Sequence, residues 1–148
     1  MTLAVDIALS GVRVPVSRAR LADVARATLR AEGVRDALVS ITFVDVREIA
    51  RLNREHLDHR GPTDVISFGF TRAAAADAVV GDIYIAPTVA RAQARERGIA
   101  VREEIIRLVV HGILHVLGHD HPVDESRERS PMWQRQERLV RRLADQRS

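Results

Sequence analysis

EEIIRLVVHGILHVLGHDH, residues 103–121, is an apolar segment that ends in a cluster of four histidines. Its apolar spacing, with two acids near the start and Gly118 near the end, predicts a helix over residues 101–118. Apolar residues at helical spacing are ordinary core material, but four imidazoles within eleven residues are not. The first question is therefore what chemistry this cluster can perform.

Three of these histidines have the spacing of ligands for one metal ion. His111 and His115 are four residues apart and therefore project from the same face of a helix. Gly118 can take the left-handed conformation that ends a helix, so that His121 can turn back toward the same point. The pattern H-x-x-x-H-x-x-G-x-x-H is the ligand skeleton of metzincin proteases. Three imidazoles and one open position are typical of a catalytic zinc site. A lone histidine is more often a surface or core group, so the prediction rests on the whole pattern.

The neighbouring residues narrow the chemistry. In H-E-x-x-H proteases the residue after the first histidine is a glutamate that acts as general base. Here that residue is Gly112, which excludes peptidase chemistry of that kind but leaves hydrolysis by metal-activated water open. His119 competes with His121 as the third ligand, although the spacing favours His121. Asp120 is a candidate for orienting an imidazole or assisting proton transfer, and stabilising a turn is an equal alternative for it.

The remaining segments alternate between strand and helix patterns. We expect strands at residues 3–9, 37–45, 64–70 and 79–87, and helices at residues 17–33, 46–57, 88–98, 101–118 and 130–144. Ser17 is a predicted N-cap, and Gly33 and Gly98 are predicted helix ends. The order β-α-β-α-β-β-α-α-α predicts an α/β domain with a small mixed sheet of about four strands packed against helices. We expect residues 1–148 to form one such domain, with the metal site on a helix and the loop after it.

Composition sets limits on location and chemistry. The chain has 148 residues, 46% of them apolar, and no cysteine, which excludes disulfides and thiolate metal sites. The N-terminal residues lack a basic stretch and make a poor signal peptide. No apolar run is long enough to cross a bilayer. These features predict a cytoplasmic protein without a membrane partner.

All 23 basic residues are arginines, and the computed isoelectric point is 10.7 although the net charge is only +3. Guanidinium groups bind phosphate well, so a polyanionic partner is one interpretation. The arginines are spread along the chain between acids, which favours a second interpretation, a compositional bias of the source genome.

Four blocks in the right order resemble the YbeY family. HGILHVLGHDH resembles the family signature HG-x-LH-L-x-GYDH. LNREH followed by GPTDVISF (residues 52–56 and 61–68) resembles the block LN…PTDVLSF, and VGDIYIA (80–86) resembles LGDI-x-I. EEIIRLVVHG resembles the run into the metal helix, and Met132 with Glu137 fits the C-terminal helix. The resemblance extends from about residue 38 onward.

This resemblance implies a metal-dependent hydrolase fold with one zinc ion held by His111, His115 and His121. Members of the family are implicated as endoribonucleases in the maturation of small-subunit ribosomal RNA and in ribosome quality control. The expected function is therefore that of a zinc-dependent endoribonuclease, with ribosomal RNA, the ribosome and ribosomal proteins as partners.

The chain departs from the family pattern in the segment after LNREH. Many members carry an arginine there that is thought to line the RNA-binding cleft, and here Leu57 stands in its place after His56. A tyrosine of the signature is replaced by His119. The candidates for the missing positive charge are Arg54, His59 and Arg60, and Arg60 is our predicted substrate-binding residue. A shifted arginine does not reproduce the same contacts.

Two other functions stay open at this point. One is a ribosome-associated RNA- or protein-binding factor whose zinc is structural. A fourth protein ligand such as His119 would favour this alternative. The other is a metallohydrolase that acts on a small ester or amide, although the sequence shows no dedicated pocket for one.

Overall fold

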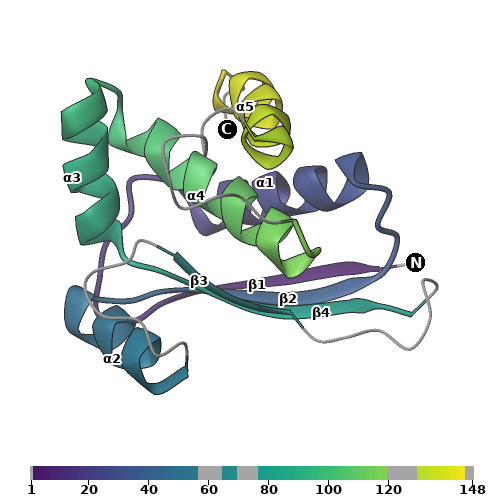
Figure 1. Cartoon of the computed structure of the whole chain (residues 1–148), viewed down its shortest axis with the longest axis horizontal. Coiled ribbons are helices and arrows are strands. Elements are labelled where there is room, and N and C mark those ends of the chain that lie inside the picture. Colours follow the sequence, from purple (N-terminus) through teal and green to yellow (C-terminus); the bar gives the residue numbers. More distant parts are fainter. Residues whose placement is uncertain (1, 57–64, 70–76, 120–129, 146–148) are drawn as a thin grey trace.

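The computed structural model describes residues 2–56, 65–69, 77–119 and 130–145. The helices and strands follow the predicted order, and their bounds differ from the predicted ones by at most two residues. They are β1 (Leu3–Leu9), α1 (Arg18–Ala31), β2 (Ala37–Phe43), α2 (Val46–His56), β3 (Val65–Gly69), β4 (Val79–Ile85), α3 (Pro87–Arg97), α4 (Val101–Val116) and α5 (Pro131–Ala144) (Figure 1). The predicted α/β fold class is confirmed.

The four strands form one mixed sheet in the order β1-β2-β4-β3. β1 pairs with β2 and β2 with β4 in parallel, whereas β3 and β4 pair antiparallel. Parallel neighbours need a crossover connection, which α1 provides between β1 and β2. The sheet order is a long-range property that the sequence did not predict.

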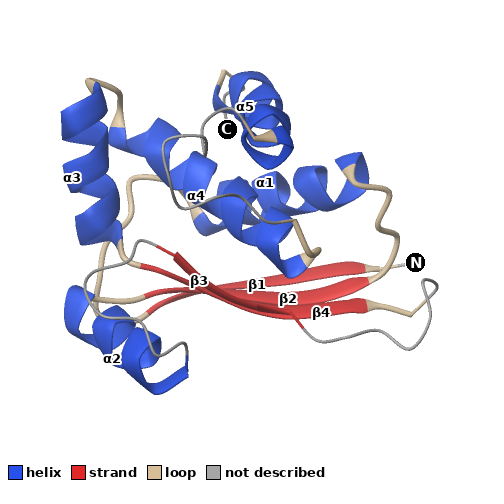
Figure 2. Cartoon of the chain, in the orientation of Figure 1, coloured by secondary structure: helices blue, strands red, loops and turns tan. Residues whose placement is uncertain are grey.

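Helices cover the two faces of the sheet unequally. α1, α3, α4 and α5 lie on one side, and α2 lies alone on the other (Figure 2). Val39, Ile41 and Phe43 alternate along β2 and are fully buried against the four-helix side. Leu38, which comes just before Val39 in the alternation, faces the other side and is 59% exposed. Burial of aliphatic side chains under α1 and α4 is therefore the main stabilising contribution.

Helix ends follow the local signals. Ser17 and Ser130 cap α1 and α5, because their side chains accept hydrogen bonds from the backbone N–H groups of Arg20 and Trp133. Gly98 ends α3 in the left-handed conformation, with φ of 67°. Within the described ranges, no helix is both long and apolar enough to span a bilayer.

Three glycines allow α4 to lie directly on β3 and β4. A Cβ atom on Gly112 would come within 2.9 Å of Cγ2 of Ile83, and one on Gly81 within 2.6 Å of Cγ1 of Val116. A Cβ atom on Gly69 would lie 2.7 Å from the backbone oxygen of Val116. Gly112 therefore faces the sheet, so its glycine identity is explained by packing and no side chain at this position would point at the histidines.

Candidate metal centre

His111 and His115 lie one turn apart on α4 with their rings in contact. The ring centroids are 4.5 Å apart and the ring planes meet at 79°. His111 is buried, with 7% of its surface exposed, and His115 is half-buried. Since zinc binds imidazole nitrogen at about 2.0–2.1 Å, two rings at this separation are close enough to give one nitrogen each to a single ion.

The rest of the predicted site lies outside the described residues. This applies to the third ligand His121, to Asp120, and to the substrate-binding candidate Arg60. Within the described part of the chain, no three His, Cys, Asp or Glu side chains gather into a metal-binding group. Gly118, with φ of 95°, turns the chain sharply just after α4, as the ligand pattern requires. The complete ligand set stays a prediction.

A hydrogen bond from α5 determines which nitrogen of His111 is available to a metal. Nδ1 of His111 lies 2.6 Å from Oε1 of Gln136, which is buried. The amide nitrogen of Gln136 donates to Oε2 of Glu137 at 3.0 Å. Because a carboxylate only accepts, the amide oxygen must be the atom that faces His111. Nδ1 then donates in this hydrogen bond, and Nε2 is the nitrogen that would bind a metal.

An ion-pair network holds Glu137 in place behind this hydrogen bond. Arg107 donates from Nε and Nη2 to the two carboxylate oxygens of Glu137, at 2.8 and 2.9 Å. It also donates to the buried Glu104 at 2.9 Å and to Glu103 at 3.2 Å. Burial raises the pKa of Glu137, but the hydrogen bonds from Arg107 and Gln136 outweigh it, so the pKa lies below its ordinary value. Glu137 is therefore a carboxylate at neutral pH and an acceptor only.

The described donors fit a zinc ion. They are two imidazoles, and the buried one is held in the tautomer that a metal ligand needs. Sequence reasoning did not single out Gln136 or Arg107. One signal was present, because Arg107 precedes His111 by four residues and so shares its face of α4.

The hydrogen bond of Gln136 to His111 leads to a prediction about metal affinity. Gln136→Met keeps the volume of the side chain but removes the acceptor for the Nδ1 proton. We expect zinc affinity to fall about 10- to 100-fold, measured by competition with a chromogenic chelator. Gln134→Met, an exposed position on the same helix, is the matched control and is expected to leave the affinity unchanged. Equal affinity of both variants would contradict the assigned role of Gln136.

His119 is directed at a different partner. Its Nε2 lies 2.7 Å from Oε1 of Glu32 at the end of α1, and the other oxygen of Glu32 accepts from Arg135 at 2.8 Å. Glu32 has a side chain that is only 7% exposed, and both its oxygens are occupied by these contacts. The contact engages Nε2 of His119, and the preference for His121 as the third ligand rests on the spacing of the sequence pattern.

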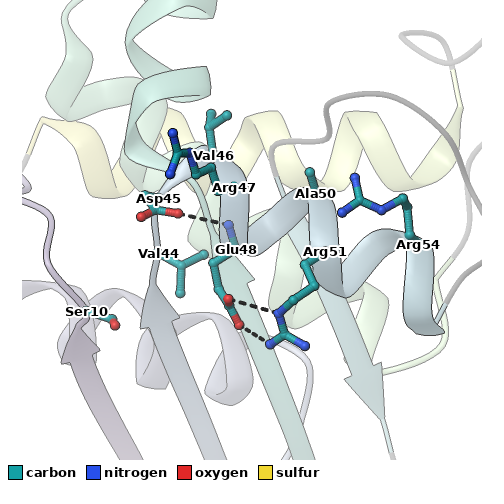
Figure 3. Close-up of a pocket in the computed structure, with 9 residues that line it drawn as sticks. All are labelled: Ser10, Val44, Asp45, Val46, Arg47, Glu48, Ala50, Arg51 and Arg54. Atoms are coloured by element: carbon teal, nitrogen blue, oxygen red, sulfur yellow. Dashed lines mark hydrogen bonds and ion pairs between the residues drawn. The ribbon is translucent and has the colours of Figure 1, made fainter.

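A cavity of about 660 Å³ surrounds the start of α2 (Figure 3). Arg54 and Arg51 line it, but Arg51 is held by ion pairs with Glu48 and Glu55. Asp45 accepts a hydrogen bond from the backbone of Glu48 at 2.8 Å and so occupies the N-terminus of α2. The described lining of this cavity contains no histidine, and Arg54 is one of its lining residues.

Comparisons with a family model and with known proteins all point to the same family. The model of the family described as endoribonuclease YbeY matches residues 11–144. An endoribonuclease YbeY of Kineococcus radiotolerans is 42% identical over 112 residues, which are 70% of this chain and 63% of that protein. An endoribonuclease YbeY of Bacillus licheniformis is 38% identical over 159 residues, covering 100% of this chain and 99% of that protein.

A solved structure shares the fold. The solution structure of a Thermotoga maritima protein superposes with a TM-score of 0.58, at 24% sequence identity, and covers 94% of this chain and 88% of that one. This likeness concerns the arrangement of helices and strands alone.

Proposed function

The chain belongs to the endoribonuclease YbeY family, and from this premise we propose that it is a zinc-dependent endoribonuclease. Its proposed task is the maturation of small-subunit ribosomal RNA and ribosome quality control. The proposed partners are ribosomal RNA, the ribosome and ribosomal proteins, which places the reaction in the cytoplasm where ribosomes are assembled.

The observation that carries this proposal is the paired arrangement of His111 and His115, with ring centroids 4.5 Å apart. Held by such ligands, a zinc ion would act as a Lewis acid that activates water and polarises a phosphoryl oxygen. The chain contributes the orientation of the ligands, since Gln136 holds the proton of His111 on Nδ1. Position 112 contributes no general base, because it faces Ile83 of β4. Asp120 remains the candidate for proton transfer.

Removing the metal tests the proposal. Protein treated with a chelator is expected to lose cleavage of a small-subunit ribosomal RNA precursor and to regain it with one equivalent of zinc. The melting temperature is recorded for both forms. Cleavage at an equal rate by metal-free, folded protein would rule out a metal-dependent reaction.

The alternative of a ribosome-associated factor with a structural zinc predicts a different outcome. Chelation would then lower the melting temperature, and the protein would still bind ribosomes under conditions in which it stays folded. It would not cleave RNA with or without zinc. A structural site is usually closed by a fourth protein ligand. In that case His119 would be the fourth ligand through Nδ1, because its Nε2 contacts Glu32.

A further inference from the structure

Arginines from two distant parts of the sequence gather on one surface. α1 and α5 lie antiparallel, because Arg20 near the start of α1 donates to the backbone oxygen of Leu143 near the end of α5, while Glu32 after α1 pairs with Arg135 near the start of α5. Six arginines that line two hollows beside these helices form what we call the arginine tract: Arg26 and Arg30 of α1, Arg35 after α1, and Arg135, Arg138 and Arg142 of α5.

The tract is hollowed rather than flat. One hollow of about 300 Å³ is lined by Arg135, Arg138 and Arg142 of α5 together with Glu32. A second hollow, of about 520 Å³, is lined by Arg26, Arg30 and Arg35. Each hollow includes a residue at the C-terminal end of α1, Ala31 in the first and Arg30 in the second.

Little negative charge balances the tract. The acid in its lining is Glu32, whose carboxylate is buried and already shared between Arg135 and His119. Asp23 lies 3.6 Å from Arg26 at one margin. Within the described ranges, Arg138 and Arg142 are exposed and form no ion pair. The surface is therefore a concentrated positive patch, unlike the interleaved charges of the linear sequence.

The tract borders the candidate metal centre through two contacts. Gln136, which holds His111, lies between Arg135 and Arg138 on α5, but it is buried whereas they are exposed. Glu32 joins Arg135 of the tract to His119, which follows the end of α4. Arg135 is therefore the tract residue linked to the histidine cluster, through Glu32 and His119.

A polyanion suits this surface better than a protein does. Stable protein interfaces depend on a desolvated core of large apolar or aromatic anchors. The exposed large hydrophobic residues of the described ranges are Leu38 and Val46, and neither lines the tract. Guanidinium forks bind phosphate oxygens in bidentate fashion, and nucleic acids bind largely through such charge contacts.

We propose that the arginine tract binds backbone phosphates of the RNA on one side of the cleavage position, with Arg138 and Arg142 as direct contacts. This inference rests on the proposed endoribonuclease function and assigns the surface along which the substrate lies.

The test is a pair of double variants with equal loss of charge. Arg138→Gln with Arg142→Gln removes two tract arginines. Arg47→Gln with Arg95→Gln removes two exposed arginines of α2 and α3, which lie outside the tract and the metal centre. Binding of zinc-loaded protein to labelled single-stranded RNA is measured by fluorescence anisotropy over a range of salt concentrations, with the RNA checked for integrity on a gel.

For the tract variant we expect affinity to fall about tenfold, and the slope of log K against log salt to decrease by about 1.4, since each lost phosphate contact contributes about 0.7. The control variant is expected to keep the slope, and both variants to keep zinc and the melting temperature. If both variants bound RNA equally weakly, the effect would come from net charge alone, and the proposal would be overturned. If the salt dependence of RNA binding were unchanged in the tract variant, the proposal would also be overturned. That result is expected if the tract binds an acidic protein instead of RNA. RNA cleavage by the unmodified chain is measured in parallel. Cleavage without an effect of the tract variant would contradict only the role of the tract, whereas absence of cleavage would contradict the endoribonuclease assignment itself.

Discussion

Replacement of His115 by alanine is expected to release the metal and to lower RNA cleavage by more than about 100-fold. His115 and His111 are the described part of the predicted ligand set, with ring centroids 4.5 Å apart. Removing even a hydrogen-bonding partner of a ligand typically costs about 10- to 100-fold in metal affinity or activity, and removing a ligand costs more. Zinc content is measured on purified protein by elemental analysis, next to cleavage of a ribosomal RNA precursor.

His119→Ala is the matched control for this experiment. It removes an imidazole from the same cluster, but one whose Nε2 contacts Glu32 instead of the histidine pair. We expect this variant to retain one zinc ion per chain. Full zinc occupancy in His115→Ala, or zinc loss in His119→Ala with His115→Ala unaffected, would show that the ligands are wrongly assigned.

The second large effect is expected for Gly112→Glu, which completes the H-E-x-x-H pattern of zinc proteases. We expect no gain of hydrolysis and a loss of more than about 4 kcal/mol in the free energy of unfolding. The first side-chain atom would already come within 2.9 Å of Ile83, which is fully buried. The carboxylate would then enter the core without a partner, and burial of an unpaired charge is strongly unfavourable.

Denaturant unfolding followed by circular dichroism measures this effect. Gly112→Ala separates the two causes, because it adds the steric contact without the charge and is expected to cost about 1–3 kcal/mol. A folded Gly112→Glu protein with faster hydrolysis would mean that position 112 faces the metal and not the sheet.

The local elements of this fold were predictable because their signals act over a few residues. Ser17 caps α1 and Gly98 ends α3, each as the pattern around it predicts. The contact between His111 and His115 likewise follows from the spacing of four residues on one helix. These features need no knowledge of the rest of the chain.

Other features depend on how distant elements pack. In the sequence, Gly112 is only a missing general base, whereas in the structure it is the point where α4 meets β4. Gln136 lies 25 residues from His111 along the chain, so no periodicity could have revealed their hydrogen bond. His121, Asp120 and Arg60 stay predictions, because they lie outside the described residues.

Periodicity and capping preferences were thus enough to predict the helices and strands, and the histidine spacing predicts that α4 binds a metal. The strand order, the proton position on His111 and the gathering of arginines on α1 and α5 emerged from the packed molecule alone. The reason is physical: hydrogen bonding and hydrophobic periodicity along one element are short-range, while contacts between elements depend on which apolar faces the whole chain buries together.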